Sequence, residues 1–213
     1  MKLALRLLGS WRVEGQGWVP RHGPFIVAAN HLSFIDPPLL CASLPRRITF
    51  MVKEELFFHP IWGAFIRAFG ALPVRRGYAD RGALRQALRL LRRGAALGVF
   101  PEGTRSRTGR LQPGHSGVSL VAVRAGVPVL PVAITGSERI RGLSNAFRRP
   151  TIAVRVGQPV MLTLSEEGTA ASSAQATDLI MARIAALLPP ERQGPYALRG
   201  QPVPGAAAGM GEA

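Results

Sequence analysis

The chain has 213 residues, of which 47% are hydrophobic and 18% charged, and this ordinary apolar content excludes a wholly disordered or fibrous protein. The length fits one domain, at roughly 100–200 residues per domain, with a substantial core. The formal net charge is +15, from 27 basic and 12 acidic residues, and Lys2 and Lys53 are the only lysines. So strong a positive charge favours an anionic partner: nucleic acid, an anionic membrane surface or a phosphorylated substrate.

The chain has one cysteine, Cys41, so it can form no internal disulfide, and it has no Cys/His spacing typical of a zinc site. We therefore expect a reducing compartment and no metal. The N-terminal residues look briefly like a signal peptide, but Arg6 interrupts the apolar run and no small-residue cleavage site follows, so we expect no export. Arg, Gly or Pro cuts every apolar stretch short of the roughly 20 residues that a transmembrane helix needs.

Short β-branched apolar runs alternate with Leu-, Ala- and Arg-rich segments, a pattern typical of an α/β layer fold. Strands are predicted at 25–29, 48–52, 71–75, 95–100, 129–135 and 151–156, and helices at 83–92, 116–125 and 174–188. A further helix is predicted after Asp36, which would serve as its N-cap before Pro37. We therefore expect a single domain over residues 1–190, with a mixed, mostly parallel β-sheet flanked by helices. The Gly-, Pro- and Ala-rich residues 191–213 are predicted to be a disordered tail.

Two polar residues that can act together, His31 and Asp36, follow the first predicted strand on one strand-to-helix loop. A curled loop can bring the carboxylate against the imidazole and fix the ring tautomer, while the other ring nitrogen takes a proton from a hydroxyl. For an isolated histidine and aspartate, a surface histidine beside an ordinary helix cap is the commoner arrangement.

Later strands also end in segments that suggest a binding site. Arg75 and Arg76 stand at the end of the strand 71–75, where guanidinium groups suit bidentate contact with a phosphate, although such a pair is usually solvated surface. The loop 100–106 could bind a glycerol phosphate through Arg105 and Thr104, with Glu102 holding a neighbouring hydroxyl or the arginine; an ordinary surface turn fits equally well.

A fourth segment, residues 127–133, is an apolar strand that contains Pro128 and Pro131. Proline cannot donate to a sheet ladder and is normally confined to edges and irregular positions. We therefore expect an edge or irregular strand that shapes a pocket wall.

Taken together, the four segments resemble the motifs of the glycerolipid acyltransferase family, in particular bacterial 1-acyl-sn-glycerol-3-phosphate acyltransferases. The resemblance covers residues 24–137 and rests on Asn30-His31-(four residues)-Asp36, Gly70 through Gly77, Phe100-Pro-Glu-Gly-Thr-Arg105 and Val129-Leu-Pro-Val132. It implies transfer of a fatty acyl group from acyl-CoA or acyl carrier protein to the sn-2 hydroxyl of 1-acyl-sn-glycerol 3-phosphate, giving phosphatidic acid. It implies no cofactor beyond this co-substrate.

The resemblance also assigns roles to individual residues. His31 is the catalytic base and Asp36 its orienting carboxylate, and we expect backbone amides near His31 or Gly103 to hold the oxyanion. Arg76 and Arg105 are the phosphate ligands, and Glu102, Gly103 and Thr104 are part of the acceptor site. Arg75 departs from the family's usual pattern, which leaves the assignment between Arg75 and Arg76 open.

The segment 56–69 interleaves aromatic and apolar residues, including Trp62 and Phe65, between Lys53 and Arg67. This pattern suits a helix that lies in the interface of an anionic leaflet, although a buried core helix fits it as well. With no spanning segment, we expect a peripheral protein on the cytoplasmic face of the cell membrane.

Two alternatives remain open at this point. The first keeps the reaction class and changes the acceptor, to glycerol 3-phosphate or to a lysolipid such as lyso-ornithine lipid. The second is a basic nucleic-acid-binding module, but aromatic residues make up only 7% of the chain and form no stacking motif. We therefore expect a lysophospholipid acceptor and no nucleic acid partner.

Overall fold

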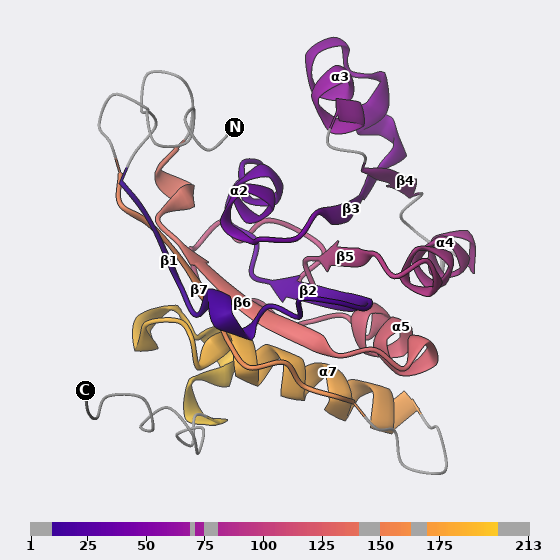
Figure 1. The fold of residues 1–213 in the computed structure, drawn as a ribbon. Coiled ribbons are helices and arrows are strands. Elements are labelled where there is room, and N and C mark those ends of the chain that lie inside the picture. The colour runs from indigo at the N-terminus through magenta and orange to yellow at the C-terminus, as the bar shows by residue number, and fades with distance from the viewer. Residues whose placement is uncertain (1–9, 69–70, 75–80, 141–149, 163–169, 200–213) are drawn as a thin grey trace, which may run out of the picture.

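The computed structural model describes residues 10–68, 71–74, 81–140, 150–162 and 170–199. A seven-stranded sheet in the order β1-β7-β6-β2-β5-β3-β4 runs through the molecule (Figure 1). Its strands are β1 (Trp11–Glu14), β2 (Phe25–Ala29), β3 (Ile48–Lys53), β4 (Leu72–Val74), β5 (Ala96–Val99), β6 (Val129–Thr135) and β7 (Ile152–Val156). The strand pairs are parallel except β6–β7, which is antiparallel. The predicted α/β class with a mixed, mostly parallel sheet is confirmed.

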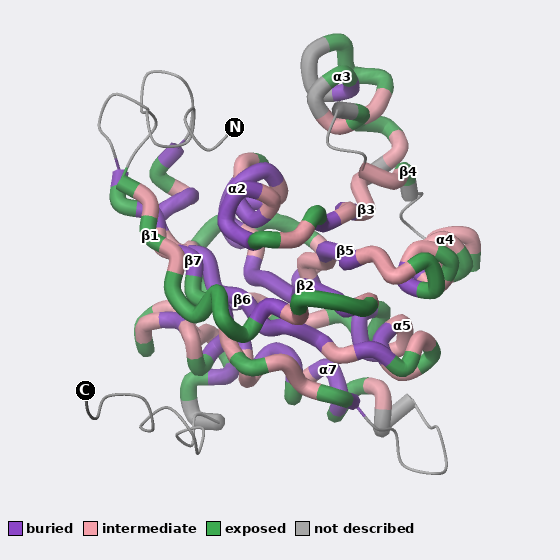
Figure 2. The backbone as a smooth tube through the Cα atoms, viewed as in Figure 1, coloured by how far each residue is buried: buried purple, intermediate pink, exposed green. Residues whose placement is uncertain are grey.

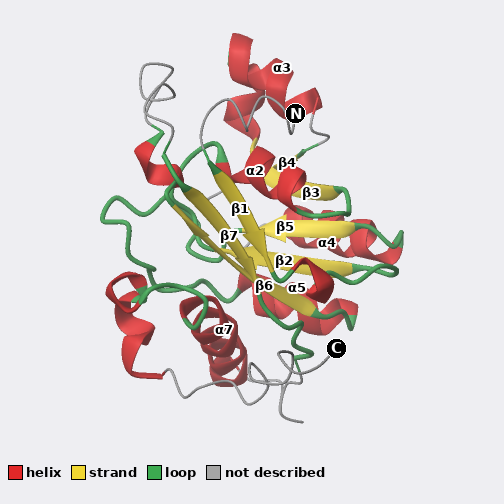
Figure 3. Ribbon diagram, turned by 60° about the vertical axis from the view of Figure 1, so that its left-hand side comes forward, coloured by secondary structure: helices red, strands yellow, loops and turns green. Residues whose placement is uncertain are grey.

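Helices cover both faces of the sheet (Figures 1 and 3). Along β2, Phe25, Val27 and Ala29 face α2 (Asp36–Ser43). Ile26 and Ala28 point to the other face, which is covered by α4 (Arg81–Arg92), α5 (Gly117–Ala125) and α7 (Ala170–Ala185). All five residues of β2 are buried, as expected for a central strand of a sheet that is covered on both faces. This strand therefore gives the loop that follows it a rigid base.

The segment between β3 and β4 projects from the body of the molecule (Figure 1). It consists of the 3-10 helix η2 (Glu54–Phe58) and of α3 (Pro60–Ala68), which pack on one another. Exposed backbone predominates along it in Figure 2, and the side chains of Leu56 and Phe58 are 43% and 80% exposed. The side chains of Trp62 and Phe65 lie outside the described residues. Within the described part of the chain, no helix has the length and apolar character needed to cross a membrane.

The strand β1 was not predicted from the sequence. It is a four-residue edge strand, Trp-Arg-Val-Glu, with alternating half-buried and exposed side chains, and it pairs in parallel with β7 from Trp11↔Ile152 to Glu14↔Arg155. The alternation is too short to stand out in the sequence. It is the pairing with β7, 141 residues away, that makes this segment a strand.

The predicted disordered tail is wrong for its first nine residues. Residues 190–199 form two further 3-10 helices, η4 (Pro190–Arg192) and η5 (Gly194–Arg199), and Tyr196 is buried in the cluster that includes α7. Gly194 has a φ of 58°, and a Cβ there would lie 2.0 Å from the carbonyl oxygen of Leu111. The segment is held by individual contacts such as those of Gly194 and Tyr196, and not by a periodic apolar face. Its sequence therefore shows no pattern from which the fold of this segment could be predicted. Residues 200–213 lie outside the described residues.

The segment 127–133 was expected to be an edge or an irregular strand. It is not an edge, because β6 pairs with β2 on one side and with β7 on the other, but its ladder is irregular. Pro131 is tolerated because the ladder on the β7 side is irregular at this point. Val129 pairs with Val160 and Val132 with Val156, so one more residue intervenes on the β7 side than on β6.

Candidate active site

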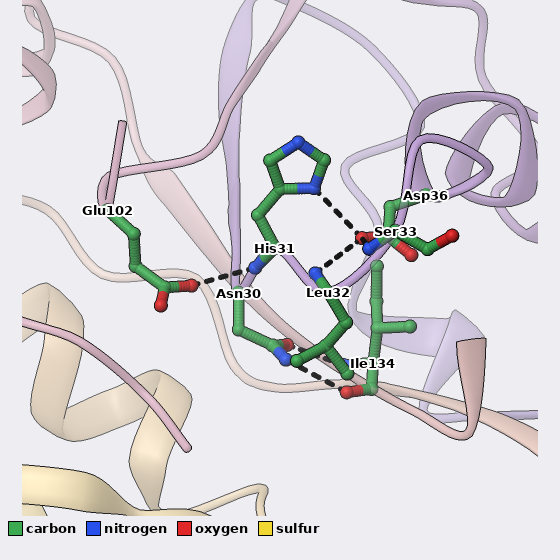
Figure 4. Close-up of polar contacts among 7 residues, drawn as sticks. All are labelled: Asn30, His31, Leu32, Ser33, Asp36, Glu102 and Ile134. Carbon is green, nitrogen blue, oxygen red and sulfur yellow. Dashed lines mark hydrogen bonds and ion pairs between the residues drawn. The ribbon is translucent and has the colours of Figure 1, made fainter. Parts of the chain in front are cut away.

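The loop between β2 and α2 brings His31 and Asp36 together. Nδ1 of His31 lies 2.9 Å from Oδ2 of Asp36 (Figure 4). The expected contact is therefore present, and it sits where a fully buried strand ends. The imidazole side chain is 16% exposed, whereas the carboxylate is completely buried.

Asp36 is held by the loop that it closes. Its Oδ2 also accepts hydrogen bonds from the backbone amides of Leu32 and Ser33, both at 2.7 Å. The carboxylate was predicted to cap α2, and this is wrong: the helix begins at Asp36 itself, with Ile35 at the N-cap position and no side-chain cap. The side chain turns back instead and stabilises the loop with charge-assisted hydrogen bonds.

The His31 ring is fixed by stacking as well as by Asp36. It lies on the ring of Phe100 with centroids 4.0 Å apart and planes 16° apart, and Phe100 stacks in turn on Phe50 at 5.5 Å. With Nδ1 directed to the carboxylate, the second ring nitrogen points away from Asp36 (Figure 4). This is the geometry in which Nε2 can accept a proton from a bound hydroxyl.

Asn30 fastens the start of this loop to the sheet, a role that the sequence did not reveal. Its Nδ2 donates to the carbonyl of Ile134 at 2.9 Å, and its Oδ1 accepts the amide of Ile134 at 2.7 Å. The side-chain amide thus continues the β2–β6 ladder by one step while the backbone leaves the sheet. The signal in the sequence is a polar residue directly after five apolar strand residues. In the structure those five residues are buried and Asn30 is only 3% exposed.

Glu102 lies inside the loop after β5 and is only 2% exposed. Its Oε1 accepts the backbone amide of His31 at 2.7 Å (Figure 4). Its Oε2 accepts the backbone amide of Gln112 at 2.9 Å. Burial raises the pKa of Glu102 to about 7, and the hydrogen bonds from the two amides offset only part of this effect. Both carboxylate oxygens therefore contact backbone amides in this structure, and the part of Glu102 in the acceptor site stays a prediction.

The backbone amides expected to hold an oxyanion are mostly engaged. Those of His31, Leu32 and Ser33 donate to carboxylates, and that of Gly103 donates to the carbonyl of Phe100 at 3.0 Å. These four amides are therefore already occupied, and the oxyanion role of neighbouring amides stays a prediction. On the same loop, the amides of Thr104 and Arg105 remain, for which no acceptor is found among the described residues.

The rest of the loop after β5 faces an open cleft of about 880 Å³. Gly103 has a φ of 67°, and a Cβ there would approach the His115 ring to 3.0 Å, so the turn requires glycine. Thr104 and Arg105 are exposed and line the cleft, and the Arg105 guanidinium lies 5.5 Å from the centre of the Phe34 ring.

Two further expectations concern residues or groups away from this loop. Arg75 and Arg76 lie outside the described residues, so their part in phosphate binding stays a prediction. Among the residues that the structure describes, no group of three or more His, Cys, Asp or Glu side chains is close enough together to bind a metal ion.

The sequence model of the family described as Acyltransferase matches residues 10–135, a span that contains the whole His31–Asp36 loop and the Glu102 loop. The chain belongs to this acyltransferase family. The family resemblance predicted from the four motifs is therefore confirmed. The fold agrees as well: the crystal structure of the 1-acyl-sn-glycerophosphate acyltransferase from Thermotoga maritima matches with a TM-score of 0.66 and 30% sequence identity, over 85% of this chain and 72% of that chain.

Several curated acyltransferases are similar to the chain. A chloroplastic 1-acyl-sn-glycerol-3-phosphate acyltransferase of Brassica napus is 31% identical over 141 residues, 64% of this chain but only 41% of that protein. The 1-acyl-sn-glycerol-3-phosphate acyltransferase of Bacillus subtilis is 29% identical over 161 residues, 75% of this chain and 78% of that protein. The lyso-ornithine lipid O-acyltransferase of Pseudomonas aeruginosa is 39% identical over 126 residues, 59% of this chain and 48% of that protein.

Proposed function

We propose that this acyltransferase moves a fatty acyl group from an acyl thioester, acyl-CoA or acyl carrier protein, to the sn-2 hydroxyl of 1-acyl-sn-glycerol 3-phosphate. The product is phosphatidic acid. The observation that carries the proposal is the 2.9 Å contact between Nδ1 of His31 and the buried carboxylate of Asp36, with the second ring nitrogen directed outward. The names of the similar proteins from Brassica napus, Bacillus subtilis and Thermotoga maritima support the choice of reaction.

In the proposed mechanism His31 is a general base. Its Nε2 takes the proton of the acceptor hydroxyl as the oxygen attacks the thioester carbonyl carbon, and Asp36 stabilises the imidazolium that forms. The tetrahedral intermediate then collapses: the carbon–sulfur bond breaks, and the imidazolium returns its proton to the leaving thiolate. The amides of Thr104 and Arg105 are our candidates for holding the oxyanion of this intermediate.

Glu102 acts in this scheme as a positioning residue and not as a substrate ligand. Its two oxygens tie the backbone of His31 to that of Gln112, and so fix the catalytic loop against the loop after β5. This bond sets where the His31 ring stands relative to Thr104 and Arg105. We place the acceptor phosphate on Arg105, which lines the cleft, together with Arg76, because a guanidinium can bind phosphate bidentately.

We further propose that the protein is peripheral, on the cytoplasmic face of the cell membrane, and docks through η2 and α3. The two-chain product is too apolar to leave a bilayer, so the enzyme must release it at the bilayer surface. Phe58 and Leu56 place apolar side chains in solvent on a projecting segment, and the +15 net charge attracts an anionic leaflet.

A lysolipid with an amino-acid headgroup is a second candidate acceptor. The lyso-ornithine lipid O-acyltransferase of Pseudomonas aeruginosa shares 39% identity with the chain, more than the 29–32% of the 1-acyl-sn-glycerol-3-phosphate acyltransferases of Bacillus subtilis, Brassica napus and Arabidopsis thaliana. The catalytic loop would serve both acceptors, because both present a free hydroxyl.

A panel of acceptors tests the proposal. The purified chain is incubated with oleoyl-CoA or oleoyl carrier protein and, in turn, with 1-oleoyl-sn-glycerol 3-phosphate, glycerol 3-phosphate and lyso-ornithine lipid, and the products are identified by mass spectrometry. We expect phosphatidic acid to form at the highest kcat/KM. Faster acylation of lyso-ornithine lipid would transfer the assignment to the second candidate, and no acylation of any acceptor would overturn both.

A further inference from the structure

The cleft beside the catalytic loop is lined mainly by polar and cationic groups. Its lining comes from the segment 104–110, from Leu32 to Phe34 of the catalytic loop, and from four residues later in the chain: Glu138, Ile140, and Glu191 and Arg192 of η4. Arg107 and Arg110 are exposed on the segment 104–110, as are the hydroxyl-bearing residues Thr104 and Thr108. Guanidinium and hydroxyl groups in a concave site are typical of sites that bind phosphate groups.

The segment that carries these arginines is fixed at both ends. The amide of Ser106 donates to the carbonyl of His31 at 2.7 Å, and its hydroxyl donates to the carbonyl of Arg110 at 2.6 Å. The amide of Leu111 donates to the carbonyl of Arg192 at 2.8 Å. The guanidinium groups of Arg107 and Arg110 therefore stand on a preorganised backbone, which lowers the cost of ordering them around a ligand.

Part of the lining comes from beyond residue 135, where the family match ends, and it contacts the segment 104–110. Arg192 donates to Glu138 at 2.8 Å, and a Cβ on Gly109 would lie 3.9 Å from Arg192 Nη1. Burial alone would raise the pKa of Glu138, but the bond and charge of Arg192 outweigh it, so that pKa is lowered. Because this pair is mutually neutralised, the remaining charges of the lining are the guanidinium groups of Arg105, Arg107 and Arg110 and the carboxylate of Glu191, which leaves the cleft net positive.

The cleft has more volume and more arginines than a single phosphate ester would use. Arg105 is already assigned to the phosphate of the acceptor under the proposed function, on which this inference rests. The volume of about 880 Å³ fits a drug-sized ligand and exceeds what a glycerol phosphate headgroup would fill. A ligand with several phosphate groups, which reaches from the catalytic loop towards η4, matches both the space and the two remaining arginines.

We propose that this cleft is the donor site, and that Arg107 and Arg110 bind the phosphate groups of coenzyme A. The thioester end would then lie at Leu32 and Ser33, which follow His31 in the chain, and the nucleotide end at Arg107 and Arg110. A concave site with room for a nucleotide favours coenzyme A over the convex acidic surface of a carrier protein.

Binding of coenzyme A without turnover tests this inference separately from the reaction itself. Isothermal titration of the full chain with coenzyme A compares the wild type with Arg107→Gln/Arg110→Gln and with the matched control Arg85→Gln/Arg89→Gln, which removes two exposed arginines of α4. We expect the cleft variant to bind coenzyme A more weakly by about ten-fold or more, and the control to bind it as the wild type does. Replacing Arg192 is a poorer test, because it would leave Glu138 without its partner.

Each other outcome overturns the inference. Equal losses in the two double variants would mean that net charge alone attracts the ligand. Unchanged binding in the cleft variant would place the donor elsewhere. A loss of affinity for glycerol 3-phosphate as large as that for coenzyme A would assign the cleft to the acceptor, and binding of pantetheinylated carrier protein but not of coenzyme A would exclude the nucleotide site. Because titration needs no acyl transfer, these results stand whichever acceptor the enzyme uses.

Discussion

The backbone amide of His31 donates to Oε1 of Glu102 at 2.7 Å, and this bond joins two motifs that lie 71 residues apart. The other oxygen, Oε2, accepts the amide of Gln112. Both oxygens therefore act only as acceptors for backbone donors. A glutamine at this position can accept at one site only, because its NH₂ group would face an N–H donor at the other.

The raised pKa of Glu102 predicts a pH-dependent contribution to stability. Its folded value of about 7 exceeds the ordinary 4.5, so between these values the folded state retains a proton that the unfolded state has released. This proton stabilises the folded state fully below about pH 4.5, and the stabilisation is lost as the pH rises to about 7. At ~1.4 kcal/mol for each pH unit between the two pKa values, it amounts to at most about 3 kcal/mol.

The variant Glu102→Gln should lack this contribution. Urea unfolding measured near pH 5 and near pH 8 should show a larger excess of wild-type over variant stability at the lower pH. The same difference at both pH values would show that Glu102 does not titrate in this range.

Loss of Arg105 should weaken binding of the acceptor more than binding of the donor. A charge-assisted bond to phosphate contributes roughly 1.5–3 kcal/mol, so Arg105→Ala should raise KM for 1-acyl-sn-glycerol 3-phosphate by about ten-fold or more. The KM for the thioester should change little, and Arg89→Ala, on the exposed face of α4, is the matched control. Initial rates with each substrate varied in turn decide this, and a matching increase in both KM values would refute an acceptor-specific role.

The exposed side chains of η2 should provide the salt-resistant part of membrane binding. Full burial of a Leu or Phe side chain is worth about 1.5–3 kcal/mol, so Leu56→Ser/Phe58→Ser should bind anionic vesicles at least about ten-fold more weakly in high salt. Vesicle flotation measures this, with Trp18→Ser/Leu179→Ser as the control, because these side chains are 48% and 40% exposed elsewhere on the molecule. If the two double variants float alike, η2 is not the docking surface.

Asn30 should be required for the position of the catalytic loop. In Asn30→Asp a carboxylate oxygen would replace the Nδ2 that donates to the Ile134 carbonyl, which places two acceptors in contact. We expect a loss of about 1–3 kcal/mol in the free energy of unfolding, together with a lower kcat. Thermal and urea unfolding measure the first effect, and a variant as stable as the wild type would show that the side-chain bonds to Ile134 are dispensable.

Local signals in the sequence were enough to predict most of the sheet. The apolar runs at 25–29 and 129–135 match β2 and β6 residue for residue, because a strand buried on both faces is apolar throughout. What was missed depends on partners far along the chain: β1 is a strand through β7, and Pro131 is tolerated through an irregularity of the neighbouring segment.

In the candidate site too, a local contact was predicted from the sequence and contacts that depend on the folded loops were not. The spacing of His31 and Asp36 predicted their contact, because the loop between them is short and both ends of it are fixed. The direction of a carboxylate was not predictable: Asp36 bonds amides of its own loop instead of capping α2, and Glu102 points inward to the His31 amide. Each of these choices depends on where the backbone donors of folded loops lie.

The central claim, that His31 removes the proton from the acceptor hydroxyl, is tested most directly by the rate of phosphatidic acid formation in His31→Ala at saturating substrates. General-base catalysis commonly contributes about 10²–10⁴-fold, so the variant should lose at least about a hundred-fold in kcat while its circular dichroism and unfolding remain those of the wild type. Asp36→Asn should show an intermediate loss. A folded His31→Ala protein that retains activity within a few-fold of the wild type would contradict the account.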